Sequence, residues 1–483
     1  SLALNQVEAG DVAALSGNVK VSSLSVTDSA ANVLANLAAL KAAGKKLGSL
    51  SQSGMPEVLS MTHSNWVTYQ GTLEKFTTGY DVALTGVNAA SASAVAANLH
   101  VQSFSVTDTA ARITSSLDAL QGVGPTLSDI TVTDSSTLIK LSAAQMQRNA
   151  GALAKISGEV HLAVSAASAA DAQTLAAKSG VDSVAVSDSS ENIASQLDAL
   201  QANTKLSAIT QTGTPAALVI TAAQVSDNAD ALGKLSGAYT LDVREATTEQ
   251  ATVLQANSHV VALDIADSSS HVGAAMAALN SMSKLGRISL TQDDGAITLS
   301  QSQLDDWNET LGKIQSTYRL AVTGVSTDNI ERLSADDRVS AMQVSATSQQ
   351  ISESFDQLVS LGSALTQLSL STPDTPIAIS QSQWQGGAAV LDKLPEAHQL
   401  NLTEVAAQDA TSLSTQAHVR GVSVADTASN IAANYDDLLA LGDALESVMV
   451  TDDSAVVVTQ EQIDGGTSLL AKFLGDHSIE PAV

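Results

Sequence analysis

The chain repeats itself with a period of roughly eighty residues, and this period constrains the fold more than any other feature. In each copy a Val-Thr-Asp phrase, or a variant of it, precedes a helical pattern. Successive intervals between the ends of this phrase are 80, 80, 79, 80 and 79 residues. In this alignment a threonine replaces the aspartate of the fifth copy. The phrase ends on Asp28, Asp108, Asp188, Asp267, Thr347 and Asp426.

A second, apolar marker keeps step with the first at intervals of 80, 79, 79, 80 and 80 residues. It falls on Leu50, Ile130, Ile209, Ile288, Leu368 and Val448. Two markers that hold the same phase predict six diverged copies of one structural unit. The predicted copies span residues 1–79, 80–159, 160–238, 239–317, 318–397 and 398–483.

The first segment of each copy predicts a strand followed by a helix. Alternate residues are apolar in 101–108, which is the period of a strand with one buried face. The next apolar residues are spaced i, i+4 and i+7, which places them on one helical face. Six such triplets occur: Val33, Leu37, Leu40; Ile113, Leu117, Leu120; Ile193, Leu197, Leu200; Val272, Met276, Leu279; Ile351, Phe355, Leu358; and Ile431, Tyr435, Leu438.

The second and third segments repeat the strand-then-helix order. In the second, a strand at 128–133 and a short apolar stretch at 138–141 precede a Ser/Thr-x-x-Gln phrase, which predicts a capping box. The third has a strand at 160–164 and then an alanine-rich helix. The capping phrases are Ser142–Gln145, Thr221–Gln224, Ser300–Gln303, Ser380–Gln383 and Thr459–Gln462.

Strands that alternate with helices predict an α/β fold with parallel strands and three strand-helix segments per copy. No segment can bury its apolar face alone, so neighbouring copies must stack. No Pro-rich or Gly/Ser-rich linker separates the copies. We therefore predict one continuous, elongated repeat solenoid over residues 1–483.

The composition agrees with many small, similar layers. Hydrophobic residues make up 44% of the chain but aromatic residues only 2%, so the core consists of Ala, Val, Leu and Ile. The 50 acidic residues outnumber the 22 basic ones, and the formal net charge of −28 disfavours nucleic acid and anionic lipid as partners. The absence of cysteine excludes disulfides and thiol chemistry. No apolar run reaches the length of a transmembrane helix, so we predict no membrane insertion.

The repeated aspartates are the most tempting candidates for a site. A row of stacked carboxylates could bind calcium, but each Asp stands where a strand gives way to a helix. A side-chain oxygen at that place caps free backbone N–H groups, and the threonine of the fifth copy also caps. We therefore interpret these residues as helix caps. The acidic pairs 293–294, 336–337 and 452–453 match no known calcium loop and are interpreted as ordinary solvated loop charge.

Histidines and tryptophans also follow the repeat. His100, His259 and His418 lie eight residues before the marker position, and His161, His398 and His477 share another position with Tyr80, Tyr239 and Tyr318. Exchange with tyrosine favours a structural role over metal or acid–base chemistry. Trp66, Trp307 and Trp384 follow the second-segment cap, where packing against a neighbouring layer is expected and a binding strip is the alternative.

The sequence contains no phosphate-binding loop, dinucleotide fingerprint, nucleophile elbow or zinc-protease motif. An enzyme needs a unique constellation of residues, and almost everything here is repeated. We therefore predict that the chain is not an enzyme, with no catalytic, cofactor-binding or metal-binding residues. Calcium is the one cofactor that stays open.

The phrases Val-Thr-Asp-Thr-Ala-Ala-Arg-Ile at 106–113 and Val-Ala-Asp-Thr-Ala-Ser-Asn-Ile at 424–431 resemble repeats of very large bacterial surface and secreted proteins. The Leu-Asp-Ala-Leu phrases at 117–120 and 197–200 belong to the same pattern. Such proteins include repetitive adhesins and RTX-like secretion substrates. The resemblance implies a spacer, stalk or coat at the cell surface or outside the cell.

We therefore expect a structural extracellular repeat protein of a bacterium: a stalk, a spacer, a surface coat or a segment of an adhesin. The alternative is a binding module that uses the solenoid face to grip a protein or a polysaccharide. Self-association and contact with a cell surface or polysaccharide are the expected interactions, because uncapped sheet edges invite further pairing.

Overall fold

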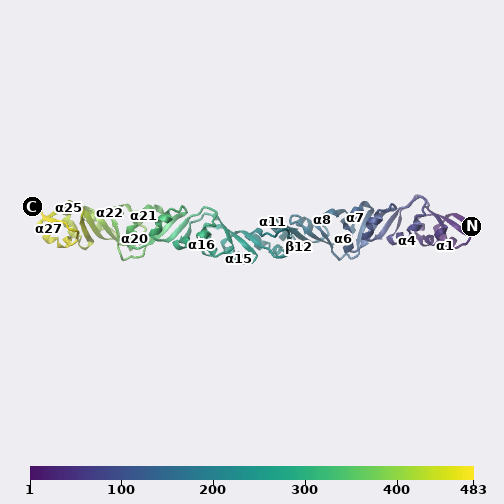
Figure 1. The fold of residues 1–483 in the computed structure, drawn as a ribbon, viewed down its shortest axis with the longest axis horizontal. Helices are drawn as coiled ribbons and strands as arrows, with labels where there is room; N and C mark the ends of the chain where they lie inside the picture. Colours follow the sequence, from purple (N-terminus) through teal and green to yellow (C-terminus); the bar gives the residue numbers. More distant parts are fainter. Residues whose placement is uncertain (483) are drawn as a thin grey trace. The chain divides into compact units, whose positions relative to one another are not determined.

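The computed structural model describes residues 1–482. The chain forms two compact units, Ser1–Val243 and Arg244–Val483. Figure 1 follows their strands and helices in sequence order, from purple at the N-terminus to yellow at the C-terminus. In both units short parallel strands alternate with short helices, which confirms the predicted α/β class.

The first unit contains three parallel sheets. Their orders are β1-β2-β3, β4-β5-β6-β7-β9 and β12-β11-β10-β8. The strands are β1 (Leu2–Val7), β2 (Val21–Asp28), β3 (Leu47–Gln52), β4 (Leu59–Thr62), β5 (Val82–Val87), β6 (Val101–Asp108), β7 (Leu127–Val132), β8 (Ile139–Ser142), β9 (Ile156–Ser157), β10 (Leu162–Ala167), β11 (Val181–Asp188), β12 (Leu206–Gln211) and β13 (Leu218–Thr221).

The second unit repeats this arrangement. β15 pairs with β16, and further sheets have the orders β17-β18-β19-β20, β21-β22-β23-β24-β26 and β25-β27. The boundary between the units falls within β14 (Leu241–Ala246). The other strands are β15 (Val260–Ser268), β16 (Leu285–Gln292), β17 (Ile297–Ser300), β18 (Leu320–Val325), β19 (Val339–Ala346), β20 (Leu365–Leu370), β21 (Ile377–Ser380), β22 (Leu400–Val405), β23 (Val419–Asp426), β24 (Leu445–Val450), β25 (Val456–Val458), β26 (Phe473–Leu474) and β27 (Ile479–Pro481).

Three kinds of helical connection recur in each copy. The first follows the long strand: α2 (Ala30–Ala35), α3 (Leu37–Ala42), α6 (Ala110–Ser115), α7 (Leu117–Gly122), α11 (Ser190–Ser195), α12 (Leu197–Gln201), α16 (Ser269–Asn280), α20 (Ser348–Glu353), α21 (Phe355–Ser360), α25 (Ala428–Ala433) and α26 (Tyr435–Ala440). The second follows the capping phrase: α4 (His63–Leu73), α8 (Ala143–Arg148), α9 (Ala150–Leu153), α13 (Ala222–Asp227), α14 (Ala229–Gly233), α17 (Gln301–Asp306), α18 (Asn308–Leu311), α22 (Gln381–Gly386), α23 (Ala388–Leu391), α27 (Gln460–Gly465) and α28 (Thr467–Leu470). The third precedes the long strand: α1 (Val12–Ser16), α5 (Ala92–Ala96), α10 (Ala172–Ala176), α15 (Thr248–Ala256), α19 (Ile330–Ser334) and α24 (Ala410–Ser414).

The chain changes sheets within each copy, and the first unit shows the route. β7 ends at Val132, and β8 follows after a loop without a helix, yet β8 pairs with β10 in the next sheet. α8 and α9 then return the chain to the earlier sheet, where Ile156 of β9 pairs with Ile130 of β7. Three successive connections therefore cross between adjacent sheets: β7 to β8, β8 to β9, and β9 to β10. The short apolar stretch at 138–141 belongs to a strand of a different sheet, which the sequence pattern did not indicate.

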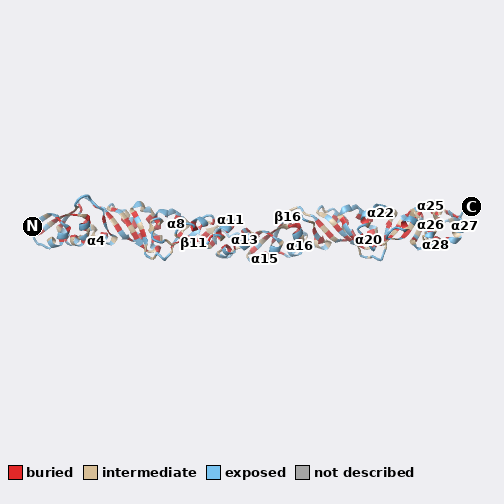
Figure 2. Cartoon of the chain, turned by 180° about the vertical axis from the view of Figure 1, so that it is seen from behind, coloured by how far each residue is buried: buried red, intermediate tan, exposed pale blue. Residues whose placement is uncertain are grey.

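The predicted apolar markers form the core of both units. Every residue of the six helical triplets is at most 4% exposed, and every second-marker residue is at most 1% exposed. Figure 2 shows buried residues in red along the strands. All five predicted capping boxes form, which confirms the helix starts read from the sequence.

The strand that opens the third segment carries a bulge. In β5, Leu84 and Val87 are partners of Phe104 and Val106, so one extra residue is inserted. Gly86 takes a positive φ of 70° at this place. The bulge leaves two successive residues exposed and returns Val87 to the core.

Candidate functional site

The marker aspartates lie at the end of the long strands, and each joins two helical layers. Asp188 shows the pattern. Its Oδ2 accepts a hydrogen bond from the backbone N of Ala169 at 2.9 Å, and its Oδ1 accepts from the backbone N of Ser189 at 2.8 Å and the amide of Asn192 at 2.7 Å. One carboxylate therefore fixes the start of two helical connections: the one that precedes the long strand and the one that follows it.

The same contact recurs in the other four copies that carry the aspartate. In each, the Oδ2 accepts from a backbone N–H nineteen residues earlier at 2.9 to 3.0 Å. We call this contact the aspartate bridge. Its pairs are Asp28 with Ala9, Asp108 with Ala89, Asp267 with Thr248 and Asp426 with Ala407.

These donors stabilise the ionised form of the carboxylates. Burial raises the pKa of Asp267, but hydrogen bonds from Thr248, His271 and Ser268 outweigh that effect and lower the pKa to about 2. The pKa values of Asp28, Asp188 and Asp426 also lie below the ordinary value, because the hydrogen bonds outweigh burial there too. The negative charge is therefore part of the folded structure in both units.

The predicted capping role needs two corrections. The N-cap residue of the following helix is the residue after the aspartate, such as Ser189 before α11. In the fifth copy Thr347 is this N-cap, with a capping box to Gln350, so Thr347 does not replace the aspartate. Ala346 does, because it pairs with Leu370 as Asp108 pairs with Val132. The fifth copy therefore has no aspartate bridge.

Both oxygens of each marker aspartate already accept hydrogen bonds from the protein. Among residues 1–482, no group of three or more His, Asp or Glu side chains is placed to hold a metal ion. These hydrogen bonds give the repeated carboxylates a structural role.

One aspartate of each acidic pair has a structural contact, so the prediction of ordinary loop charge is wrong for Asp294, Asp336 and Asp452, whereas their neighbours are exposed. Asp294 accepts hydrogen bonds from the backbone N of Ser270 at 2.9 Å and from its hydroxyl at 2.7 Å, and these bonds lower the pKa of Asp294. Asp452 accepts from the backbone N of Ala428 at 2.9 Å. Asp336 binds the guanidinium of Arg338 through both of its oxygens, at 2.7 and 2.9 Å.

Lysines join layers in a way that the sequence analysis did not identify. Lys46 Nζ donates to the carbonyls of Ser16 at 2.6 Å and Asn18 at 3.1 Å, at the end of α1. Lys284 does the same to Gln255 and Asn257 at 2.7 and 2.8 Å. Since carbonyls at a helix C-terminus attract cations, these lysines act as C-terminal caps from the next layer. Their regular position just before a strand was the signal available in the sequence.

The aromatic positions pack in pairs. We call the position two residues before the bulged strand the first ring position, and the position twenty residues later the second. Tyr80 stacks on His100 and His398 stacks on His418, each with 4.1 Å between ring centroids. Trp66 is buried, whereas Trp307 and Trp384 are partly exposed.

The assignment of His161 to the first ring position is wrong. Leu162 begins β10 as Val82 begins β5, so Val160 is the equivalent of Tyr80. His161 is the next residue along the chain, and its Nδ1 lies 2.8 Å from Asp182 Oδ2. Gly180 occupies the second ring position of this copy.

Comparison with known proteins leaves the chain without an assigned relative. No protein-family model, no curated protein and no solved structure matches it. Among the described residues, no helix is long and apolar enough to cross a membrane.

Proposed function

We propose that the chain is a structural protein of the bacterial cell exterior: a stalk, a spacer, a surface coat or a segment of an adhesin. In this proposal the copies form one continuous, elongated solenoid. The aspartate bridge carries the argument. A recurring carboxylate is used, copy after copy, to fix one layer to the next rather than to contact a ligand.

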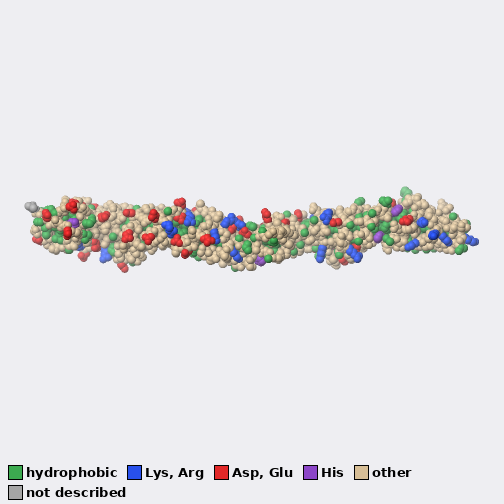
Figure 3. All heavy atoms as spheres, viewed as in Figure 1, with side chains coloured by type: hydrophobic (Ala, Val, Ile, Leu, Met, Phe, Trp, Pro, Cys, Tyr) green, Lys and Arg blue, Asp and Glu red, His purple; other side chains and the backbone are tan. Residues whose placement is uncertain are grey.

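The sheet change inside each copy supports the same role. Because the connections from β7 to β8, from β8 to β9 and from β9 to β10 all cross between the two sheets, three stretches of backbone join them. Such interleaving resists the separation of neighbouring copies, as a load-carrying spacer requires. Figure 3 shows acidic and basic side chains interspersed on the face in view, and the net charge of −28 favours solubility of a repetitive chain.

Small-angle scattering of the purified full chain, in calcium and in a chelator, tests this proposal. We expect the distance distribution of an extended, rigid particle that does not change on chelation. A compact particle contradicts the solenoid. A particle that extends only in calcium contradicts the interpretation of the aspartates as cation-independent bridges.

A further inference from the structure

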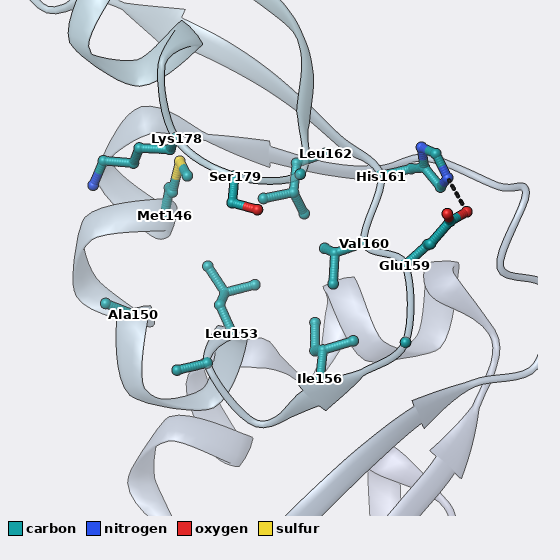
Figure 4. Close-up of a pocket in the computed structure, with 13 residues that line it drawn as sticks. Met146, Ala150, Leu153, Ile156, Glu159, Val160, His161, Leu162, Lys178 and Ser179 are labelled. Carbon is teal, nitrogen blue, oxygen red and sulfur yellow. Dashed lines mark ion pairs between the residues drawn. The ribbon is translucent and has the colours of Figure 1, made fainter.

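The first unit contains a groove of about 780 Å³ beside the start of β10. Its walls come from α8 and α9, from β9, and from the loop that ends at Gly180. Figure 4 shows the side chains of Leu153, Ile156 and Val160 converging on the opening. The groove has apolar side chains on its helix side, the polar side chains of Glu159, Lys178 and Ser179 around it, and the size of a small-molecule site.

Other copies fill the same place with rings of their own. Tyr80 and His100 are stacked there in one copy, and His398 and His418 in another. In a third copy the guanidinium of Arg338 lies over the ring of Tyr318, 5.6 Å from its centroid. In the groove copy the two ring positions hold Val160 and Gly180, so neither supplies a ring.

The helix wall of the groove lacks rings as well. Met146 stands where the first copy has Trp66, and Ile156 stands where it has Phe76. Phe76 packs against Tyr80 with 5.6 Å between ring centroids. Without a tryptophan and a phenylalanine at these two positions, the helix wall of the groove is less covered than the same wall in the first copy.

Equivalent wall residues differ in burial accordingly. Leu73 is 0% exposed and Phe76 is 9% exposed, whereas Leu153 and Ile156 are only half-buried. The groove is therefore the space that a ring cluster occupies elsewhere in the same fold.

We propose that this groove binds a neutral, planar aromatic ring, with the phenol ring as its best match. The repeats supply the reasoning, because the equivalent positions hold stacked rings in two other copies and a ring beneath a guanidinium in a third. Apolar walls reward burial of a ring, and aromatic rings contribute large contact areas at low entropy cost. The hydroxyl of Ser179 lies beside the opening, where it can hydrogen-bond the polar edge of a phenol.

The charged groups around the groove favour a neutral ring. The amine of Lys178 and the ring of His161 point away from the opening in Figure 4. His161 is engaged by Asp182 at 2.8 Å and by Glu159 at 3.9 Å. A charged ring would lose hydration without gaining a partner inside the groove.

The test uses methyl NMR spectra of the full chain, titrated with p-cresol, which is neutral at pH 7. We expect ring-current shifts at the methyl groups of Leu153, Ile156 and Val160, and no shifts at Leu73, which is the equivalent of Leu153 in the first copy. Cyclohexanol serves as the non-aromatic control probe. An affinity for cyclohexanol equal to that for p-cresol, read from the smaller methyl shifts of each titration point, or no shifts with p-cresol, overturns the proposal.

Two double variants extend the test: one adds rings to the groove, and the other removes a ring pair from the first copy. Met146→Trp with Ile156→Phe copies the walls of the first copy and is expected to abolish the p-cresol shifts. Tyr80→Val with His100→Gly removes a resident ring pair and is expected to create a second p-cresol site in the first copy. Unchanged p-cresol binding in a folded Met146→Trp/Ile156→Phe chain contradicts the groove as the site.

The ring could belong to a tyrosine of a partner protein or to a free small phenol. A second titration, with a glycine-flanked tyrosine peptide, distinguishes these two sources. Tighter binding of the peptide than of p-cresol assigns the ring to a partner protein. Tighter binding of p-cresol assigns it to a free small phenol.

Discussion

Lysine side chains in this acidic chain have a specific structural use at the residue scale. Lys46 reaches two carbonyls at the end of α1, whereas its neighbour Lys45 is exposed. We expect Lys46→Met to lower the free energy of unfolding by about 1 kcal/mol, because two carbonyls lose a charged donor. Lys45→Met is the matched control and should leave stability unchanged. Urea denaturation measures both, and equal effects would contradict the capping role.

The fifth copy offers a gain-of-function test of the aspartate bridge. Ala346 is 3% exposed, close to the 5% of Asp108, so the site accommodates a carboxylate in another copy. We expect Ala346→Asp to raise the free energy of unfolding by about 1 kcal/mol, since a new charge-assisted hydrogen bond from Thr327 N exceeds the cost of burial, whereas Thr347 N already donates to Gln350 Oε1. Ala346→Asn, with a single acceptor oxygen, should gain less. Thermal unfolding provides the comparison, and a destabilised Ala346→Asp chain would refute the bridge as a stabilising contact.

Two residue assignments show where sequence reasoning stops. The intervals between copies vary between 79 and 80 residues, so a marker can be placed one residue off without breaking the period. For this reason the sequence pattern puts Thr347 at the marker position, which Ala346 holds in the structure. It also puts His161 at the first ring position, which Val160 holds. Only the strand register separates them, because a shift of one residue turns a side chain to the opposite face of a sheet.

The bulged strand is the element with the most constrained backbone. Its bulge residue has a positive φ at Gly86 and Gly324, but also at Ala166, where φ is 51°. Side chains with a Cβ are disfavoured in this region, and glycine is not. We expect Ala166→Gly to stabilise the first unit by up to about 1 kcal/mol, and Gly86→Ala to destabilise it by a similar amount.

These two substitutions exchange alanine and glycine in opposite directions at equivalent positions, so each is the control for the other. A Cβ at Gly86 would meet no atom within 4 Å, so the effect of Gly86→Ala comes from backbone strain alone. Differential scanning calorimetry gives the sign of each change. The same sign for both substitutions would exclude strain as the cause.

Elements with local signals were predictable, and elements that depend on distant pairing were not. Ser142 and Gln145 lie three residues apart and satisfy each other within one helix turn, so the capping box is readable from sequence. The sheet to which β8 belongs depends on β10, more than twenty residues later. Nothing in the loop before Ile139 specifies that pairing. The groove was also hidden, because it arises from the absence of rings at Val160 and Gly180.

At the scale of the whole molecule, the aspartate bridges predict how stability depends on pH. Lowered aspartate pKa values occur in both units, at Asp28, Asp188, Asp267 and Asp426. A carboxylate with a lowered folded-state pKa stabilises the protein above its unfolded pKa and loses that contribution as the pH falls through the folded value. We therefore expect the urea midpoint to fall steeply on acidification below about pH 4.

Asp267 sets the size of the effect. Its pKa changes from 3.8 to about 2 on folding, so the charged form contributes roughly 2 kcal/mol above about pH 4. Asp267→Asn should lose this contribution at neutral pH and approach the wild-type stability as the pH falls to about 2, because about half of the wild-type carboxyl groups are then protonated in the folded state. Asp293→Asn is the control, since this carboxylate is 53% exposed and its pair with Arg319 is worth little in water. If the free energies of unfolding of the wild type and Asp267→Asn differ by the same amount from neutral pH down to about pH 2, the negative charge of Asp267 is not the source of the stabilisation.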